Sequence, residues 1–281
     1  MATELFRAVL PVLDLESADA FWSKLLDLEV DRSIPLRHYI RTGGAILTLV
    51  DTAGHARAHG HDAEPFRANP DWFYFRVPDL HATWARAQEL GCPPAKSGEG
   101  TGIALRDWGD RSFYTYDPFG NPVCLIDDVH SDTTPEKTRY TGSPIASLVN
   151  VVLPTTSMGH AEGFYGELLA LDADSFVPNR RFFYLDGCQL SLVNPAEHAR
   201  AHGLDEAPFR PNPEIVYFAV SDLDATWERA QKLGMRPLAD DPDLGDGIQT
   251  HPWGERSFYG LDPSSNPISF VDDQTLYRGR S

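Results

Sequence analysis

Hydrophobic and polar positions along the first fifty residues predict a strand, a helix and a hairpin, in that order. Residues 6–13 alternate between apolar and polar positions as a strand does, and residues 16–26 place their apolar side chains at helical spacing. Two further apolar runs, 37–41 and 45–50, are joined across a Gly-Gly pair, which is typical of a hairpin turn.

A second strand, helix and hairpin follow. Residues 72–77 alternate as a strand, and Asp79 is placed to cap a helix that covers 80–90 and ends at a glycine. Strands at 111–116 and 122–126 flank the sequence Asp-Pro-Phe-Gly-Asn, in which each residue type favours a turn. The order β-α-β-β-β is therefore predicted twice.

The same pattern then returns. Residues 49–91 recur as 192–234, at an offset of 143, and 108–128 recur as 253–273, at an offset of 145. Self-similarity at so long a period indicates tandem domains and not short solenoid units. The predicted organisation is a first domain over 1–129, a polar linker over 130–146, a second domain over 147–273 and a tail over 274–281.

Composition narrows the class of protein. The 281 residues carry a formal net charge of −17, so nucleic acid and anionic membranes are not expected as partners. No apolar run reaches the roughly 18 residues of a membrane span, and the N-terminal residues do not resemble a secretory signal. Three cysteines form no disulfide framework, so a cytoplasmic monomer or homodimer is the expectation.

Paired β-α-β-β-β units, a Pro-Val-Leu-Asp-Leu-Glu joint at 11–16 and a closing Asp-Pro-Phe-Gly-Asn-Pro hairpin at 117–122 resemble the vicinal oxygen chelate superfamily. That superfamily includes glyoxalase I, bleomycin-resistance proteins and extradiol dioxygenases. The resemblance implies an α+β fold with four βαβββ units forming two tandem glyoxalase-like domains. Each domain is then an open, curled, mixed sheet around a cleft, with helices outside.

The resemblance also implies where a metal would lie. Enzymes of the superfamily hold a divalent metal with His, Gln or Glu on the first and last strands of each unit. Counting from local landmarks gives eight such positions, and none holds an imidazole or a carboxylate. We therefore expect no metal and no other cofactor in either cleft. The eight residues are Arg7, Thr48, Trp72 and Cys124 in the first copy and Asn150, Ser191, Ile215 and Ser269 in the second.

A different metal site is conceivable at the sequence His-Ala-Arg-Ala-His, which occurs in both copies. Its histidines, at i,i+4 spacing on a helix, would share one face. No third ligand is fixed by the sequence, and a surface helix inherited by duplication explains the motif equally. The residues concerned are His55 and His59, and His198 and His202.

Strand alternation adds Tyr74, Arg76 and Tyr217 to the same faces as the eight positions. The first cleft is then predicted to be aromatic with two arginines, and the second to be smaller and neutral. Such a surface suits a small organic ligand, an aromatic one above all. Arg7 would hold an anionic group of the ligand or form a buried structural ion pair, and the sequence does not decide between these roles.

These expectations favour a metal-free binding protein similar to the bleomycin-resistance proteins, which would sequester an antibiotic or an aromatic metabolite. The alternative is an enzyme of the superfamily, a lyase, isomerase or dioxygenase, with a non-standard or metal-free active site. No catalytic base–nucleophile pair is identifiable from spacing. Arg111 and Arg256 are expected to anchor the closing turns of their hairpins.

Overall fold

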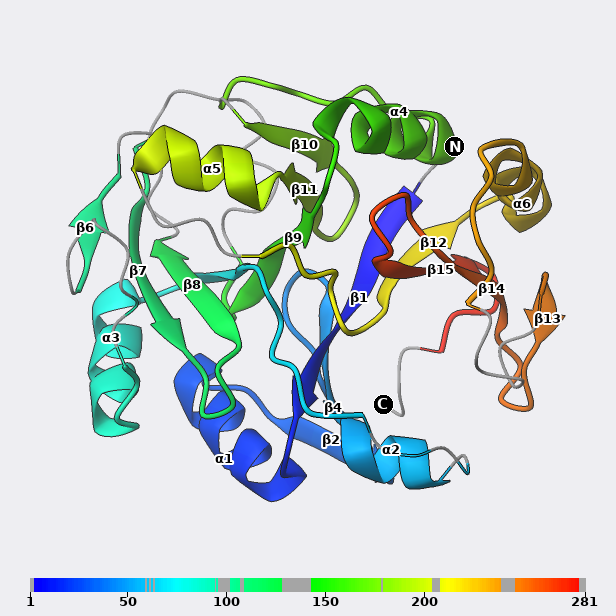
Figure 1. Ribbon diagram of the computed structural model, residues 1–281. Coiled ribbons are helices and arrows are strands. Elements are labelled where there is room, and N and C mark those ends of the chain that lie inside the picture. Colours follow the sequence, from blue (N-terminus) through cyan, green and yellow to red (C-terminus); the bar gives the residue numbers. More distant parts are fainter. Residues whose placement is uncertain are drawn as a thin grey trace. The chain divides into compact units, whose positions relative to one another are not determined.

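A computed structural model describes residues 3–58, 60, 62, 64–93, 95, 102–106, 109–127, 143–177, 179–203, 208–238 and 246–277. These residues form two open mixed sheets with α-helices packed on them, which confirms the α+β class and the β-α-β-β-β order (Figure 1). One sheet has eight strands in the order β13-β14-β15-β12-β1-β4-β3-β2. The other has seven, in the order β10-β11-β9-β5-β8-β7-β6.

The elements of the first copy run from β1 to β8. They are β1 (Thr3–Val12), α1 (Leu15–Leu26), β2 (Val30–Ile34), β3 (Arg37–Ile40), β4 (Ile46–Asp51), α2 (Thr52–Ala58), β5 (Phe73–Val77), α3 (Leu80–Glu89), β6 (Ala104–Leu105), β7 (Arg111–Tyr116) and β8 (Pro122–Asp127). The short elements β2, α2 and β6 were not predicted, because too few residues carry their period.

The second copy repeats most of these elements. They are β9 (Ser147–Pro154), α4 (Met158–Leu169), β10 (Arg180–Tyr184), β11 (Gln189–Val193), α5 (Pro195–His202), β12 (Val216–Val220), α6 (Leu223–Lys232), β13 (Gln249–Thr250), β14 (Arg256–Leu261) and β15 (Pro267–Asp272). Among the described residues no helix has the length and hydropathy of a membrane-spanning segment.

The compact units of the fold do not coincide with the two sequence copies. Unit 1 consists of Met1–Ala8 with Val152–Arg278, and unit 2 contains Val9–Val151. The chain therefore changes unit inside β1 and inside β9, and not at the predicted linker, of which 130–142 lies outside the described residues. The physical reason is strand pairing. The start of β1 pairs antiparallel with β12, and the start of β9 pairs antiparallel with β5.

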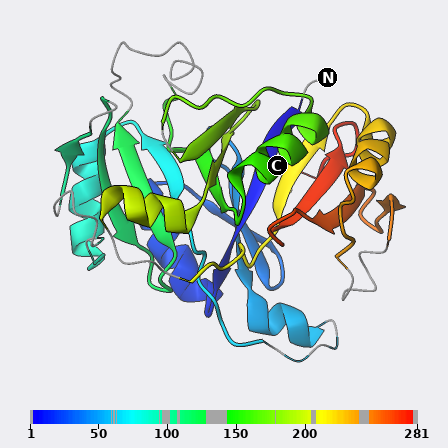
Figure 2. The same ribbon diagram turned by 45° about the horizontal axis from the view of Figure 1, so that its top comes forward.

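Helices pack on the sheets as their apolar faces require. Asp79 and Asp222 cap α3 and α6, each carboxylate accepting a backbone N–H at 2.9 Å. In unit 1, α6 packs against β15 (Figures 1 and 2). There Trp227 lies with its ring centroid 5.0 Å from that of the fully buried Phe258, which confirms its predicted role between helix and sheet.

One buried asparagine closes each terminal hairpin in the same way. In unit 1, Asn266 donates to the Pro154 carbonyl at 2.8 Å and to Asp262 at 2.7 Å, and its oxygen accepts the Asn212 N–H at 2.8 Å. Burial raises the pKa of Asp262, and the hydrogen bonds from Asn266 oppose that shift. The asparagine thus ties the turn to the end of β9 and to the loop before β12.

Unit 2 repeats this network. Asn121 donates to the Pro11 carbonyl at 2.9 Å and to Asp117 at 2.7 Å, and it accepts the Asn69 N–H at 2.8 Å. Each asparagine is fully buried. The Asp-Pro-x-x-Asn turn therefore also fixes the start of the central strand of its own unit.

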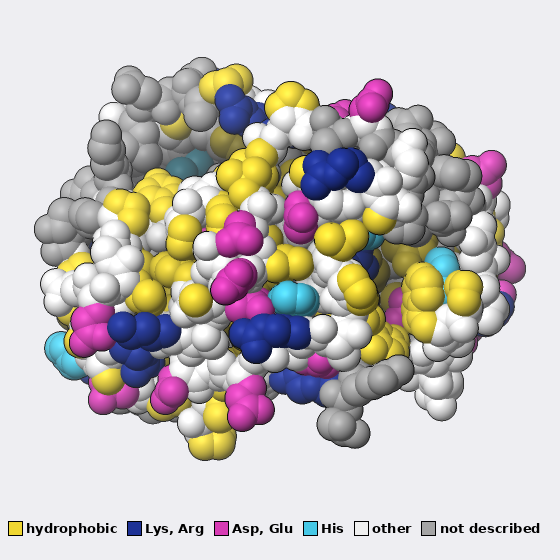
Figure 3. Space-filling model, turned by 90° about the horizontal axis from the view of Figure 1, so that it is seen from below, with side chains coloured by type: hydrophobic (Ala, Val, Ile, Leu, Met, Phe, Trp, Pro, Cys, Tyr) yellow, Lys and Arg dark blue, Asp and Glu magenta, His cyan; other side chains and the backbone are white. Residues whose placement is uncertain are grey.

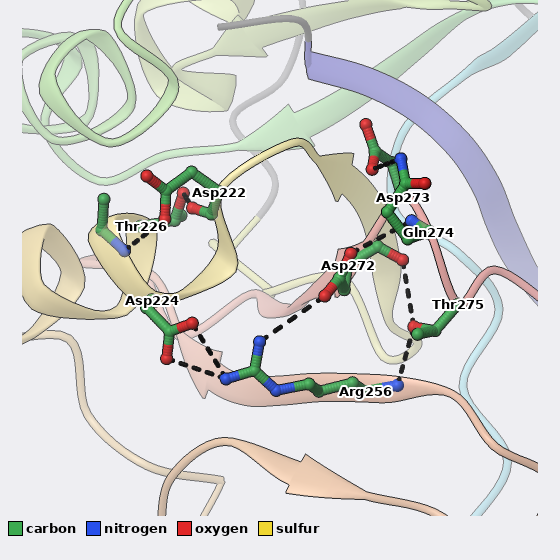
Figure 4. A network of polar contacts seen from close by, with 9 residues as sticks. Asp222, Asp224, Thr226, Arg256, Asp272, Asp273, Gln274 and Thr275 are labelled. Atoms are coloured by element: carbon green, nitrogen blue, oxygen red, sulfur yellow. Dashed lines mark hydrogen bonds and ion pairs between the residues drawn. The ribbon is translucent and has the colours of Figure 1, made fainter.

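The arginines expected to anchor these turns lie elsewhere. Arg111 pairs with Asp127, and Arg256 binds Asp224 of α6 at 2.8 and 2.9 Å and Asp272 at 3.5 Å (Figure 4). Both carboxylates at the strand ends are the antiparallel neighbours of the arginine strands. The prediction was wrong because it chose the aspartate of the turn and overlooked the aspartate that ends the hairpin.

Candidate functional site

A row of side chains crosses three neighbouring strands of unit 1. Arg7 of β1 is paired with Tyr217 of β12, which is paired with Ser269 of β15. The three residues are 4%, 2% and 0% exposed. The guanidinium carbon of Arg7 lies 4.7 Å from the centroid of the Tyr217 ring, so cation–π attraction contributes to its position.

The equivalent row in unit 2 carries no charge. Asn150 of β9 is paired with Tyr74 of β5, which is paired with Cys124 of β8. The tyrosine is common to both rows, whereas Arg7 is replaced by Asn150 and Ser269 by Cys124. The two copies of the sequence have therefore kept one aromatic residue and diverged on both sides of it.

The rows correct the grouping predicted from the sequence. Arg7 lies beside Tyr217 of the other copy, and not with Tyr74, because β1 pairs with β12. Trp72 and Ile215 each lie just before a strand, two residues ahead of the row. The landmark count placed them in the row because seven residues separate Arg7 from its helix cap, but only five separate Tyr74 from Asp79.

Arg7 has two partners in unit 1. Its Nη2 donates to the main-chain carbonyl of Tyr277 at 2.6 Å and lies 3.5 Å from Glu255 Oε2. Glu255 is 1% exposed and also accepts the Tyr277 N–H at 3.2 Å. The buried ion pair that the sequence left open as one role for Arg7 is therefore present.

His251 lies beside this pair. Its Nε2 is 2.8 Å from Ser257 Oγ, and its ring stacks on the exposed Trp253 with centroids 4.5 Å apart. Burial lowers the pKa of His251, and the nearby Glu255 carboxylate opposes that shift. The neutral imidazole is consequently favoured at this position.

Unit 2 presents an aromatic face, which we define as Trp72, Tyr74 and Tyr114. The Trp72 and Tyr114 rings meet edge to face with centroids 4.8 Å apart, and those of Tyr74 and Tyr114 are 6.3 Å apart. All three are only partly buried and pack against a buried cluster that includes Cys124. The face therefore has a solid apolar base and exposed ring surface.

Polar groups lie at the margin of the aromatic face. The guanidinium carbon of Arg106 is 4.8 Å from the centroid of the Tyr114 ring, and Arg106 Nε donates to Ser112 Oγ at 2.8 Å. Asn150, next to Tyr74 in the row, is half-buried. Burial raises the pKa of the Cys124 thiol to about 12, so this thiol stays protonated.

Sequence reasoning missed Arg106, Tyr114, Glu255 and the role of Tyr277. The repeat offset of 145 contains the signal for two of them. It aligns Arg106 with His251, and both residues hold the serine six positions further on. The backbone role of Tyr277 has no side-chain signature and is visible only in the fold.

The remaining predicted ligand residues occupy several strands. Thr48 in β4 and Ser191 in β11 are fully buried, and Ser191 Oγ accepts from the Gln189 amide at 3.1 Å. Arg76 in β5 is buried, whereas Ile215 is half-buried. Their binding to a ligand remains a prediction.

The His-Ala-Arg-Ala-His segments lie on α2 and α5. His55 Nε2 is 3.4 Å from the guanidinium of Arg37, a neighbour that repels a metal cation. His59 and the side chain of His202 lie outside the described residues, so a metal site with His198 is not tested. Within the described part of the chain, no group of three or more His, Cys, Asp or Glu residues could hold a metal ion.

Surface features beyond the rows add little to the choice of ligand. On the face shown in Figure 3, acidic and basic side chains lie next to one another, so the net charge of −17 is not gathered there into one patch. A groove of about 400 Å³ follows the end of α4 and is lined by Gly163, Gly166, Ala170 and acidic neighbours. Its lining contains no residue of either row.

Comparison with known proteins agrees with this architecture. The model of the Glyoxalase/Bleomycin resistance protein/Dioxygenase superfamily matches residues 4–125. No curated protein matches the chain. Glyoxalase I from Zea mays is similar in fold, with a TM-score of 0.67 at 13% identity, covering 98% of this chain and 94% of that protein.

A second solved structure, titled as a dioxygenase of still unproven activity from Bacillus subtilis, has a TM-score of 0.55 at 11% identity, covering 96% of this chain and 85% of its own. Identities this low establish the fold and not the activity. The family model covers the first copy, and the internal repeat extends the same fold through the second. The chain is a tandem member of the Glyoxalase/Bleomycin resistance protein/Dioxygenase superfamily.

Proposed function

We propose that the chain binds a small aromatic molecule on the aromatic face of unit 2. The observation that carries this proposal is the set of three partly exposed rings, Trp72, Tyr74 and Tyr114, packed edge to face over a buried base. Rigid rings in such an arrangement offer large contact area at low entropic cost. Arg106 and Asn150 at the margin supply a cation and an amide that would orient a polar substituent.

The residues of the two rows do not fit the divalent metal that the superfamily's enzymes hold. In unit 1 the row contains a guanidinium already paired with a carboxylate at 3.5 Å. In unit 2 it contains an amide, a phenol and a thiol whose pKa, near 12, keeps it from becoming the thiolate that binds metals. We therefore infer binding without metal chemistry, and sequestration of an antibiotic or aromatic metabolite is the physiological role that suits it.

The test uses the difference between the copies. A panel of aromatic compounds is screened by thermal shift, and hits are titrated by isothermal calorimetry against wild type and the Trp72→Ile variant, which copies Ile215 from the other repeat. We expect affinity to fall at least tenfold, because each well-buried aromatic contact contributes about 1–3 kcal/mol. Ile215→Ala is the matched control and should leave the affinity unchanged. Equal binding by wild type and Trp72→Ile would refute the proposal.

Metal content is measured in parallel on untagged protein by elemental mass spectrometry. Less than about a tenth of an equivalent after dialysis against zinc, nickel and manganese would support a metal-free site, because true sites bind tightly. A stoichiometric metal would instead favour the enzyme alternative.

One contact could be taken to favour an enzyme. His251 Nε2 and Ser257 Oγ lie 2.8 Å apart, as a base and nucleophile would. However, Ser257 is fully buried, and Arg106 makes the same contact with Ser112 in unit 2. Since arginine cannot act as a base there, we assign the contact a structural role, and a lyase or dioxygenase remains the second candidate.

A further inference from the structure

Two buried charges of unit 1 hold both polar groups of a single backbone residue. Arg7 donates to the carbonyl of Tyr277 at 2.6 Å, and Glu255 accepts the N–H of the same residue at 3.2 Å. The two side chains lie 3.5 Å from each other. Tyr277 is thus bound as a ligand would be, through one donor and one acceptor.

Burial makes this a built site. The side chains of Arg7 and Glu255 are 5% and 1% exposed, so each charge depends on its few partners. Because cation and carboxylate offset one another, the pair has no preference for a charged ligand. Its geometry instead matches a group that offers an N–H and a C=O together, as the residue of an extended peptide does.

The segment that fills the site is the C-terminal strap, which we define as residues 273–277. It leaves β15 with Asp273 N–H bonded to the Val220 carbonyl at 3.0 Å, and Thr275 Oγ1 accepts the Arg256 N–H at 2.9 Å (Figure 4). Beyond Thr275 no ladder of strand hydrogen bonds holds the described part of the strap. Segments held by a few isolated contacts open at lower free energy than strands do.

We propose that Arg7 and Glu255 form a second binding site, specific for secondary amides in extended peptide-like ligands, and that the C-terminal strap is its intramolecular occupant. A tethered segment acts at an effective concentration in the millimolar range, so a free ligand must wait for the strap to leave. The strap therefore sets the affinity that this site shows. The site lies wholly in unit 1 and does not depend on the aromatic face of unit 2.

The test supplies the strap in trans. The probe is a fluorescein-labelled peptide with the sequence of residues 273–279 and an amidated C-terminus, followed by fluorescence anisotropy. It is titrated into the full-length wild type and into full-length Tyr277→Pro, whose own strap can no longer donate to Glu255. Thr275→Val, which removes the contact with Arg256, is a second opened variant in case the first fails to fold.

We expect the opened variants to bind the probe at least tenfold more tightly than wild type. A probe carrying proline in place of Tyr277 should bind at least tenfold more weakly, because it lacks the N–H, whereas a Gln274→Ala probe should bind within twofold of the parent. Folded, opened variants that ignore the probe, or equal binding of the parent and proline probes, would overturn the proposal. Loss of aromatic-ligand binding in Trp72→Ile bears only on unit 2.

Discussion

The buried asparagines of the closing turns allow one prediction to be worked through in numbers. Replacing Asn266 by alanine removes three hydrogen bonds of 2.7–2.8 Å. The Asn212 N–H and the Pro154 carbonyl are then left without this partner in the interior, at about 1–3 kcal/mol for each unsatisfied group. Asp262 also loses a donor to its carboxylate.

We expect Asn266→Ala to lower the free energy of unfolding by about 3–5 kcal/mol, since the unsatisfied groups account for most of the loss. Asn121→Ala should cost a similar amount, because its bonds to Asn69, Pro11 and Asp117 repeat the network. Equilibrium urea unfolding, followed by tryptophan fluorescence and circular dichroism, measures both. Each variant should shift the transition of its own unit.

Two further variants sharpen the comparison. Gln274→Ala alters an exposed side chain and should stay within about 0.5 kcal/mol of wild type. Asn266→Asp keeps the shape of the side chain but places a second carboxylate where the amide nitrogen now lies 2.7 Å from Asp262. It should therefore be at least as destabilising as alanine at neutral pH. A loss below about 1 kcal/mol in both alanine variants would refute the reasoning that these side chains hold the turns.

Three other outcomes are expected. Ala170→Gly should raise the free energy of unfolding by about 1 kcal/mol, because Ala170 caps α4 at φ 54°, and a lower urea midpoint would contradict this. Native protein should show Ellman reactivity at Cys92 alone, and slowly, since Cys124 and Cys188 are buried; all three thiols should react in denaturant. Burial raises the pKa of Asp262, so its stabilising contribution is complete below the unfolded pKa and is lost as pH rises through the folded one. The advantage of wild type over Asp262→Asn in urea unfolding should accordingly be larger at pH 4 than at pH 7, and the reverse trend would count against it.

Much of the fold follows from local sequence. The helix caps Asp79 and Asp222, the Asp-Pro-x-x-Asn hairpins and the long repeat each have a short-range signature, and the structure contains all of them. Strand partnership has no such signature, because β1 alternates in the same way whether it pairs with β5 or β12. The sequence therefore predicted the tandem architecture but grouped the site residues by copy.

The candidate site was predictable only in part. Arg7, Tyr74, Tyr217, Asn150, Cys124 and Ser269 were named from strand alternation, and the structure aligns them in two rows. Trp72 and Ile215 were placed in the rows because the count assumed joints of equal length. Glu255 beside Arg7 required knowledge of contacts between residues 248 positions apart, which no local pattern contains.

The shared first strand also has a consequence for the order of synthesis. Residues 3–8 are among the first to leave the ribosome, yet their partners in β12 follow much later, since Arg7 and Tyr217 are 210 residues apart (217 minus 7). At translation rates of about 5–20 residues per second, that gap corresponds to a delay of roughly 10–40 seconds. Throughout this interval the beginning of the chain is a strand without its β12 neighbour. Unit 1 is therefore completed only after its last strands are made, and a nascent chain carrying the first repeat alone has no means of assembling it.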